Sequence, residues 1–447
     1  IIATGTSSNA VINLEEPEYI NDFSPVDLSD FGIKTQKAVI YNNNGKSISF
    51  FGDMRSEYRG SVVKAMASSK DGYPIITKLL ESVYCSSIGT IDFFETINKN
   101  CRAKIVTIDW IADHITEIVV ESKLAAENFY PGQFFKFQNF EINSDVIKYD
   151  NCEKTNLSME GVALTGSFVD KKSGFISLII LKVGGSSNLF DRLKIGEYIN
   201  LMGPTGAPTE IPENETVLLI GGGLGNAVLF SIGGAMLKNG CKVLYCAGYK
   251  KKKDLFKMSS IESASTQVLW ACEEELIVPR RSQDRSFCGN IIDAILDYAT
   301  TCSRVVDRRH CNFEEGKIHQ IMEENISEAM ISLSEVDRII VIGSDGMMNS
   351  FNEARKTKLA PYLKKNHKAF ASINSPMQCM MKEVCGQCLQ RHIDPLSGKE
   401  RFVYTCTNQD QSMELVDFSN LSDRLGQNSL QEKLTKEWVE FIQGDVV

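Results

Sequence analysis

The stretch TVLLIGGGLGNAVLFSIGGAMLKNGCKVLYC, residues 216–246, decides the fold predicted for this chain. The apolar run Val217–Ile220 predicts a buried strand, and it leads directly into the turn Gly221-Gly222-Gly223-Leu224-Gly225. Asn226–Lys238 then has the length of a helix, and Lys242–Cys246 has the apolar pattern of a second strand. Strand, glycine turn, helix and strand in this order predict a parallel sheet with crossover helices.

The glycine turn is a candidate nucleotide site, made of Gly221, Gly222, Gly223, Gly225 and Asn226. Glycines let a backbone approach a pyrophosphate closely, and the N-terminus of the following helix supplies amide donors and a positive dipole. A glycine run alone is a weak signal, but its place between a strand and a helix favours a bound nucleotide. A tight turn without a ligand is the alternative.

A second loop of the same sheet is a candidate to face a nicotinamide ring. Arg338–Ile342 predicts the last clear strand, and Gly343-Ser344-Asp345-Gly346-Met347-Met348 follows it. Ligands of open α/β sheets lie at the carboxyl ends of the strands, which is where this loop begins. A simple connection from strand to helix, with both methionines in the core, is the alternative, and the loop by itself favours that alternative.

Bulk properties exclude some classes of function. The uncharged run from Val217 to Leu237 is 21 residues long, enough for a bilayer, but its six glycines fit a strand, turn and helix better. We therefore expect no membrane span. The N-terminus lacks the charged-then-apolar pattern of a secretion signal, so we expect a cytoplasmic protein. The net charge of −9 argues against nucleic acid as a partner, because that partner needs a basic face.

The rest of the chain divides into segments that differ in their predicted secondary structure. Short alternating strands from Cys101 to about Pro212 predict an antiparallel barrel. Apolar Ser47–Phe51 predicts a strand, Gly60–Leu80 a helix, and 272–335 an insertion of helices. The predicted divisions are an α/β piece at 1–84, a connector at 85–100, the barrel at 101–212, the parallel-sheet domain at 213–370, a cysteine-bearing subdomain at 371–415 and a helical tail at 416–447.

Two turns of the barrel segment are candidates for a flavin. Pro131-Gly132-Gln133-Phe134 precedes a strand, and Gly184-Gly185-Ser186-Ser187 offers backbone N–H groups and hydroxyls that suit a flavin pyrophosphate. Each string is also ordinary turn chemistry when it is taken alone.

Four of the 13 cysteines lie within 28 residues, and their spacing is the strongest single signal in the chain. Cys379, Cys385, Cys388 and Cys406 read C-x5-C-x2-C-x17-C. Three thiolates from a tight loop and one from a distant strand are the ligand set of a [2Fe–2S] cluster, and the loop is one residue longer than the plant type. A structural zinc site, which more often pairs two C-x2-C knuckles, and no metal at all are the alternatives.

Together, and in this order, the motifs resemble the ferredoxin–NADP reductase superfamily over about residues 100–410. The nearest branch is that of the electron-transfer subunit of dihydroorotate dehydrogenase and the small subunit of NADH-dependent ferredoxin:NADP oxidoreductase. The resemblance implies that Pro131–Phe134 opens a flavin barrel, Gly184–Ser187 holds the flavin pyrophosphate and Gly221–Gly225 holds NAD(P). It also implies that Gly343–Met348 lies near the nicotinamide and that the four cysteines hold the cluster.

Two departures from that family matter. Its Arg-x-x-Ser/Thr flavin motif falls near 159–166, where the sequence reads MEGVALTG without an arginine. Thr165 then stands where the family has the hydroxyl that faces flavin N5. The nicotinamide loop lacks its usual cysteine and has Ser344 and Asp345 instead.

Residues 1–84 resemble the C-terminal end of the glutamate synthase small subunit and its pyridine nucleotide–disulfide oxidoreductase relatives. Ala3-Thr4-Gly5-Thr6 matches an Ala-Thr-Gly turn, and Phe51-Gly52-Asp53 matches a Gly-Asp motif whose aspartate binds the FAD ribityl chain. The amino-terminal glycine fingerprint of that fold is absent, so we do not expect this piece to hold FAD unaided. We expect that the sequence is part of a longer, fused protein.

The predicted fold class is multidomain α/β plus β-barrel: an antiparallel flavin-binding barrel, a parallel-sheet NAD(P)-binding domain, a small C-terminal [2Fe–2S] subdomain and a partial α/β flavoprotein domain at the N-terminus. The resemblance implies electron transfer between NAD(P)H, FAD and the cluster, onward to a flavoprotein domain upstream in the chain or to a separate acceptor subunit. The reducing arm of a glutamate synthase-like enzyme is one alternative. A non-catalytic, zinc-binding assembly module, motivated by the missing arginine, is the other.

Overall fold

The computed structural model describes residues 2–4, 24–31, 39–43, 46–52, 55–58, 61–81, 89–148, 154–306, 330–375, 379 and 383–444. The chain divides into two compact units, Ile1–Phe93 and Phe94–Val447.

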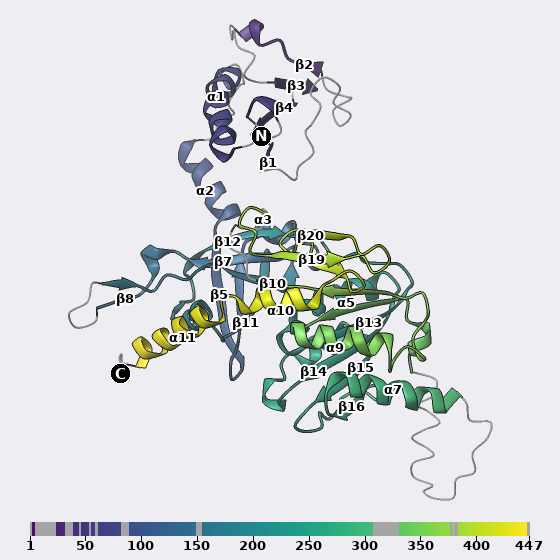
Figure 1. Ribbon diagram of the computed structural model, residues 1–447. Helices are drawn as coiled ribbons and strands as arrows, with labels where there is room; N and C mark the ends of the chain where they lie inside the picture. Colours follow the sequence, from purple (N-terminus) through teal and green to yellow (C-terminus); the bar gives the residue numbers. More distant parts are fainter. Residues whose placement is uncertain are drawn as a thin grey trace, which may run out of the picture. The chain divides into compact units, whose positions relative to one another are not determined.

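The first unit contains a four-stranded sheet of order β1-β4-β3-β2 and a helix (Figure 1). The predicted strand and helix are confirmed as β4 and α1, and Asp53 lies outside the described residues. Helix α1 lies close to β4, because a Cβ at Gly72 would be 1.8 Å from the Phe51 ring and Ser68 Oγ accepts the Gly52 N–H at 2.6 Å. The elements are β1 (Ile2–Thr4), β2 (Ser24–Pro25), β3 (Val39–Asn43), β4 (Lys46–Gly52) and α1 (Val62–Leu80).

The predicted connector is helical over most of its length, since α2 spans Thr90–Cys101. Its sequence, TIDFFETINKNC, places apolar residues three and four apart between polar ones, which is the period of an amphipathic helix. Gly89 directly precedes the helix, and its carbonyl accepts the Phe93 N–H at 2.9 Å, but this start signal was not recognised from the sequence.

A closed antiparallel barrel of strand order β10-β11-β6-β5-β12-β7 begins the second unit. The side chains on alternate strand positions fill its interior, and Phe135, Phe137 and Phe190 are fully buried there. The elements of this region are β5 (Ala103–Ala112), β6 (Ile115–Glu121), α3 (Lys123–Glu127), β7 (Phe134–Asn139), β8 (Val146–Ile147), β9 (Thr155–Asn156), β10 (Val162–Asp170), β11 (Phe175–Leu181), α4 (Gly185–Asn188) and β12 (Tyr198–Thr205).

A seven-stranded sheet of order β16-β15-β14-β13-β17-β18-β21 follows, and all its strands are parallel except β21. Arg338–Ile342 is not the last strand, because β18 and β21 extend the sheet beyond it. In the predicted 272–335 insertion the described residues form β16 and α7. The elements are β13 (Thr216–Gly222), α5 (Asn226–Lys238), β14 (Lys242–Tyr249), α6 (Met258–Ser263), β15 (Gln267–Cys272), β16 (Arg285–Cys288), α7 (Ile291–Val306), β17 (Arg338–Ile342), α9 (Asp345–Lys356), β18 (Lys368–Ser372) and β21 (Asp410–Ser412).

The sheet is covered on both faces. Helices α5 and α6 contribute to the apolar cluster on one face, and α7, α9 and α10 contribute to the cluster on the other. Ile115 and Ile179 of the barrel belong to the α5 cluster, so barrel and sheet share a core. Arg338, at the start of β17, also binds Glu210 through two hydrogen bonds of 3.0 Å and Glu215 through one of 2.8 Å. These contacts hold the barrel and the sheet in one unit.

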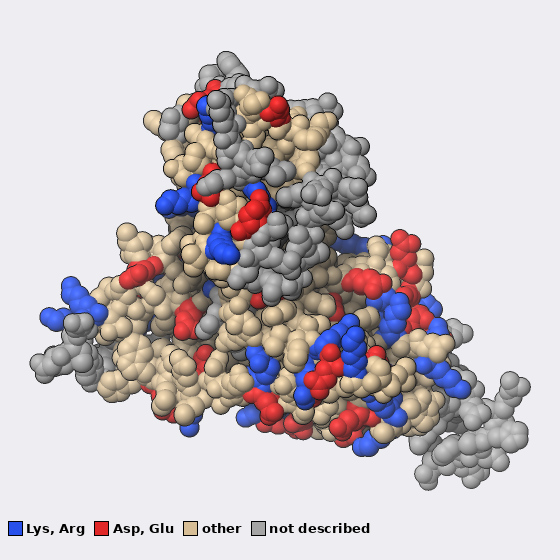
Figure 2. Space-filling model, turned by 45° about the horizontal axis from the view of Figure 1, so that its top comes forward, with Lys and Arg blue, Asp and Glu red and all other residues tan. Residues whose placement is uncertain are grey.

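The C-terminal part supplies a hairpin and two helices: β19 (Leu389–Ile393), β20 (Glu400–Tyr404), α10 (Phe418–Gly426) and α11 (Ser429–Gly444). Within the described part of the chain, no helix has the length and apolarity that crossing a bilayer requires. Lys and Arg side chains are interspersed with Asp and Glu on the face shown in Figure 2.

Asp410 at the start of β21 gives a first testable prediction. It is half-buried with its Oδ1 shielded from solvent, and burial raises the pKa of its carboxyl above the usual range. The folded chain therefore keeps this proton to a higher pH than the unfolded chain does. As the pH rises from the pKa of Asp410 in the unfolded chain to its higher pKa in the folded chain, the folded state loses stability. Asp410→Asn should raise the melting temperature at pH 7, with the gain shrinking toward pH 4.

Melting curves at both pH values check this expectation. Asp109→Asn, at an exposed position of β5, is the control and should leave the melting temperature unchanged. A gain from Asp410→Asn that is larger at pH 4 than at pH 7 would contradict the assignment.

Candidate functional site

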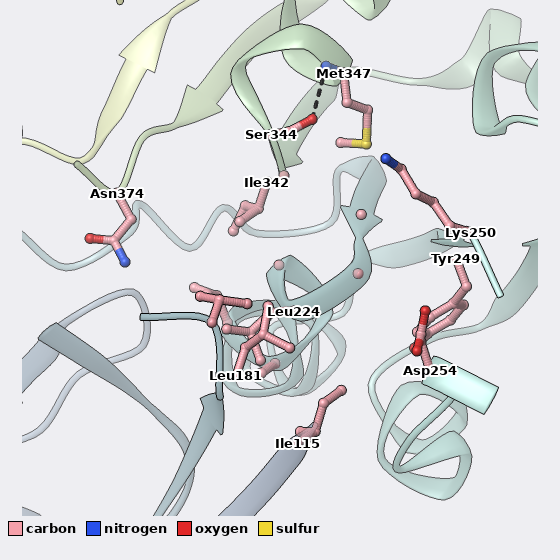
Figure 3. Close-up of a pocket in the computed structure, with 18 of the residues that line it drawn as sticks. Ile115, Leu181, Leu224, Tyr249, Lys250, Asp254, Ile342, Ser344, Met347 and Asn374 are labelled. Atoms are coloured by element: carbon pink, nitrogen blue, oxygen red, sulfur yellow. Dashed lines mark hydrogen bonds between the residues drawn. The ribbon is translucent and has the colours of Figure 1, made fainter. Parts of the chain in front are cut away.

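A cavity of about 1310 Å³ lies in the second unit, between the barrel and the carboxyl ends of the parallel strands (Figure 3). Its walls come from β6, β10 and β11 of the barrel, the turns after β13, β14 and β17, and helix α11. Of the residues that the sequence singled out, Thr165, Gly222, Gly223, Gly225, Gly343, Ser344 and Gly346 line it. The others in this unit lie outside the lining.

The glycine turn after β13 presents its backbone to the cavity. At two of its glycines, neighbouring atoms leave no room for a side chain. A Cβ at Gly221 would lie 2.1 Å from Asn226 Oδ1, and one at Gly225 would lie 2.4 Å from the Ile342 carbonyl oxygen. Buried Asn226 donates its side-chain N–H to the Gly223 carbonyl at 2.9 Å. Gly221 and Asn226 thus shape the turn from behind, while Gly222, Gly223 and Gly225 face the cavity.

The loop after β17 also reaches the cavity, but its polar residues are used differently from the prediction. Ser344 Oγ accepts the Met347 N–H at 3.2 Å and caps α9, and Asp345 is not among the lining residues. Met348 is buried in the core, as the alternative interpretation expected. Met347 instead lines the cavity, and its position was not recognised from the sequence.

On the barrel wall, Thr165 stands on β10 directly opposite Phe134 of β7. Its hydroxyl lies 3.4 Å from the Gln133 carbonyl oxygen and also lines the cavity. His114, Ile115, Ala163 and Leu181 line the same wall. The alternation of residues along each strand predicts which side chains point out of the barrel. Which of these face the cavity depends on packing against residues far away in the sequence.

The turn Pro131–Phe134 holds the barrel to the C-terminal part of the chain. Gln133 Nε2 donates to the Gly206 carbonyl at 2.9 Å, and Gln409 Nε2 donates to the Gly132 carbonyl at 2.7 Å. Gly132 has φ of 88°, where a glycine is favoured, and a Cβ there would lie 2.1 Å from Thr209 Oγ1. None of its residues lines the cavity, but Phe134 is buried against Cys388 and Cys406.

The structure brings two of the four predicted metal ligands together. Cys388 and Cys406 are buried side by side, and a hydrogen bond between their thiols lowers the pKa of Cys388 to about 6 and raises that of Cys406. Cys379 accepts the Val384 N–H at 3.3 Å, and Cys385 accepts the Gln387 N–H at 3.4 Å. In the described residues, no three His, Cys, Asp or Glu side chains are gathered at metal-binding distances.

These features nonetheless fit a cluster with thiolate ligands. Backbone amides donate to Cys379 and Cys385, as they do to cluster sulfurs, and Cys388 and Cys406 place two further thiols beside each other. The sulfurs of Cys379 and Cys406 also lie close enough for a Coulomb effect on the pKa of Cys406.

Ala163 of β10 connects the wall of the cavity with the surroundings of the buried thiols. It lines the cavity, and it packs against the cluster formed by Phe134, Cys388 and Cys406. The cavity and the buried thiols therefore border the same part of the barrel.

The predicted flavin turn Gly184–Ser187 is covered by helix α11. Ser187 Oγ accepts the N–H groups of Val183 and Gly184, at 3.0 and 2.9 Å. A Cβ at Gly185 would lie 2.3 Å from Thr435 Cγ2, and one at Gly184 would lie 2.9 Å from Glu432 Oε2. Val439 and Ile442 of the same helix are buried in the barrel core. A diphosphate bound to the Gly184–Ser187 turn would therefore collide with α11. The cavity itself has room for the rings of a ligand.

Charged side chains also line the cavity. Lys250 follows β14 and points toward Met347, while its neighbours Lys251, Lys252 and Lys253 pair with surface carboxylates (Figure 3). Lys182 is held by Asp191 at 3.1 Å. The remaining charged or titratable side chains in the lining are His114, Asp254, Glu273, Asp293, Lys358, Lys436 and Glu440.

Comparisons with known proteins agree with this architecture. No family model matches the chain. An uncharacterized protein of Rickettsia prowazekii is 29% identical over 388 residues, which cover 87% of this chain and 41% of that protein. The electron transfer subunit of dihydroorotate dehydrogenase B (NAD(+)) from Bacillus pumilus is 26% identical over 161 residues, 35% of this chain and 57% of that subunit.

Among solved structures, an NADH-dependent reduced ferredoxin–NADP oxidoreductase covers 75% of this chain and 96% of its own, with 20% identity and a TM-score of 0.54. At that identity the match shows a shared fold. The chain spans 41% and 57% of the two curated relatives.

Proposed function

Since the chain resembles the electron-transfer-subunit branch of the ferredoxin–NADP reductase superfamily in sequence and in fold, we propose that it is an NAD(P)H-dependent flavin and iron–sulfur oxidoreductase. When bound, FAD would take a hydride from NAD(P)H and a [2Fe–2S] cluster would carry single electrons onward. The acceptor is a flavoprotein domain upstream in the same chain or a separate subunit, and the cytoplasm is the compartment.

The observation that carries this proposal is the position of the cavity. It joins the barrel wall, the glycine turn and the loop after β17, and Ala163 of that wall packs against the cluster of Phe134, Cys388 and Cys406. Electron transfer requires redox groups that lie close together, and a barrel wall that borders both the cavity and the thiol-containing cluster fits that requirement.

On the sheet side, Gly222, Gly223 and Gly225 would admit the dinucleotide backbone, with Gly221 and Asn226 fixing their turn. Gly343 and Gly346 line the cavity without side chains of their own, and Ser344 holds the loop after β17 in place by capping α9.

On the barrel side, Thr165 would place its hydroxyl beside the flavin ring, and Phe134 behind it would contact the cluster ligands. Cys379, Cys385, Cys388 and Cys406 would hold the cluster.

A visible spectrum and metal analysis of the chain purified without oxygen test the proposal. We expect a flavin band, an iron–sulfur shoulder and bleaching of the flavin by NADH or NADPH. A colourless protein with about one zinc and no iron would instead support the non-catalytic assembly module.

The flavin diphosphate gives a second testable prediction. Glu432 places a carboxylate beside Gly184, where the family would bind that diphosphate. Removing this like charge by Glu432→Gln should strengthen FAD binding about two- to fivefold, the effect of one partly exposed charge pair. Quenching of FAD fluorescence during titration of the flavin-depleted chain measures the affinity.

Glu437→Gln is the matched control. Glu437 lies on the same helix, is exposed and pairs with Lys433 four residues earlier. Equal affinities for FAD in the two variants would show that the diphosphate does not approach Gly184.

A further inference from the structure

The winding of the sheet reverses between β13 and β17. The chain proceeds from β13 to β14, β15 and β16 on one side, and then returns to place β17 and β18 on the other side. Open α/β sheets bind ligands in the crevice at such a switch point, outside the carboxyl ends of the strands. Gly222 ends β13 and Gly343 follows β17, so these two residues flank the crevice.

The side chain of Met347 lies across both glycines. A Cβ at Gly222 would be 2.5 Å from Met347 Sδ, and one at Gly343 would be 2.4 Å from Met347 Cε and 3.0 Å from Sδ. Figure 3 shows this side chain directed into the cavity, close to Lys250. The thioether therefore fills the space above the backbone at the switch point.

The backbone of Met347 is held in place, and its side chain is only partly buried against the core. Ser344 Oγ accepts the Met347 N–H at 3.2 Å, and the next residue, Met348, is buried in the core. Methionine has three rotatable side-chain bonds and no branch, so another rotamer clears the crevice without moving α9.

We propose that Met347 is a displaceable occupant of the crevice and a specificity-determining residue, which the nicotinamide ring must push aside to bind. This rests on the proposed function, since it takes NAD(P) as the ligand of the cavity. The ring cannot reach Gly222 and Gly343 while the thioether covers them.

The thioether does not cover the rest of the glycine turn, since a Cβ at Gly223 would have nothing within 4 Å and the atoms nearest to one at Gly225 belong to Ile342. The ADP-ribose half, with its diphosphate, would lie against these two glycines. A ligand that carries the ring binds only while the crevice is open. Its apparent affinity is therefore its intrinsic affinity multiplied by the fraction of molecules in the open state.

The test compares NAD⁺ with ADP-ribose, which lacks the ring, by calorimetric titration of the full chain with its flavin oxidised. NADP⁺ and 2′-phospho-ADP-ribose are titrated in parallel. Met347→Ala should tighten binding of the dinucleotide about three- to tenfold, for an open fraction of roughly a tenth to a third, and leave the ADP-ribose affinity unchanged. Met202→Ala is the control, because Met202 is 38% exposed on β12 and outside the cavity lining.

A second variant gives the opposite shift. Met347→Phe places a rigid ring that cannot fold away, and it should weaken dinucleotide binding while ADP-ribose still binds. Two outcomes would overturn the inference about Met347 and leave the proposed function standing. In one, Met347→Ala shifts the affinity for the dinucleotide and for its ring-free counterpart equally. In the other, Met347→Ala binds NAD⁺ and NADP⁺ no more tightly than the unaltered chain does. If the unaltered chain binds none of the four ligands, the proposed function fails, and the role of Met347 fails with it.

Discussion

Replacing Cys388 with serine should remove iron from the chain and reduce acceptor reduction by at least about 100-fold, more than the roughly 10- to 100-fold cost of losing a residue that supports a metal ligand. Cys388 and Cys406 are both fully buried and are hydrogen-bonded to each other, so Cys388 is held in place beside another predicted ligand. A serine hydroxyl has nearly the same volume but does not supply a thiolate.

The same variant should keep reduction of the flavin by NAD(P)H close to that of the unaltered chain, because Cys388 is not among the residues that line the cavity. Iron analysis, stopped-flow reduction of the flavin and steady-state reduction of a one-electron acceptor measure the three quantities. Cys101→Ser, at an exposed cysteine of α2, is the control for loss of a thiol. Full iron content in the Cys388 variant would refute the ligand assignment.

The second large effect is expected at Gly225. A Cβ there would lie 2.4 Å from the Ile342 carbonyl oxygen and 2.8 Å from its carbonyl carbon, and neither backbone atom can rotate away. Gly225→Ala should therefore push α5 from the end of β17 and lower the free energy of unfolding by about 1–3 kcal/mol. Dinucleotide binding should weaken too, since the turn and this helix start form one wall of the cavity.

Gly234→Ala, in the middle of the same helix, is the matched control. Nothing lies within 4 Å of a Cβ at Gly234, and alanine is the better helix former, so this variant should be about 0.4–1 kcal/mol more stable. Urea unfolding monitored by Trp fluorescence compares the two variants. Equal free energies of unfolding for Gly225→Ala and Gly234→Ala would show that α5 can move away from β17 without destabilising the fold.

The parts of the fold that the sequence predicted well are those fixed by local pattern. Val217–Ile220, the glycines after it and Asn226–Lys238 obey backbone rules that do not depend on distant residues, and they form β13, the turn and α5. The amphipathic helix α2 and the strand β18 were missed: Gly89 directly before α2 was not recognised as a helix start, and β18 is a short strand without a glycine motif.

The candidate site was predictable only in its backbone-lined portion. Glycines that approach a ligand are visible as motifs, whereas Met347 and Lys250 reach the cavity through packing that spans about a hundred residues of sequence. Thr165 was placed by resemblance and not by spacing. The cover of Gly184 and Gly185 by Glu432 and Thr435 joins positions about 250 residues apart, and no local pattern predicts such a contact.

The segment that follows β20 connects three parts of the molecule at once. The N–H of Thr405 donates to the Cys388 carbonyl at 3.1 Å, and the Thr407 carbonyl accepts the Ala207 N–H from the barrel exit at 3.1 Å. Gln409 binds Gly132 through its side chain, and its carbonyl accepts the Ile373 N–H at 2.9 Å. A substitution that displaced this segment would therefore disturb the barrel, the edge of the sheet and the hairpin together.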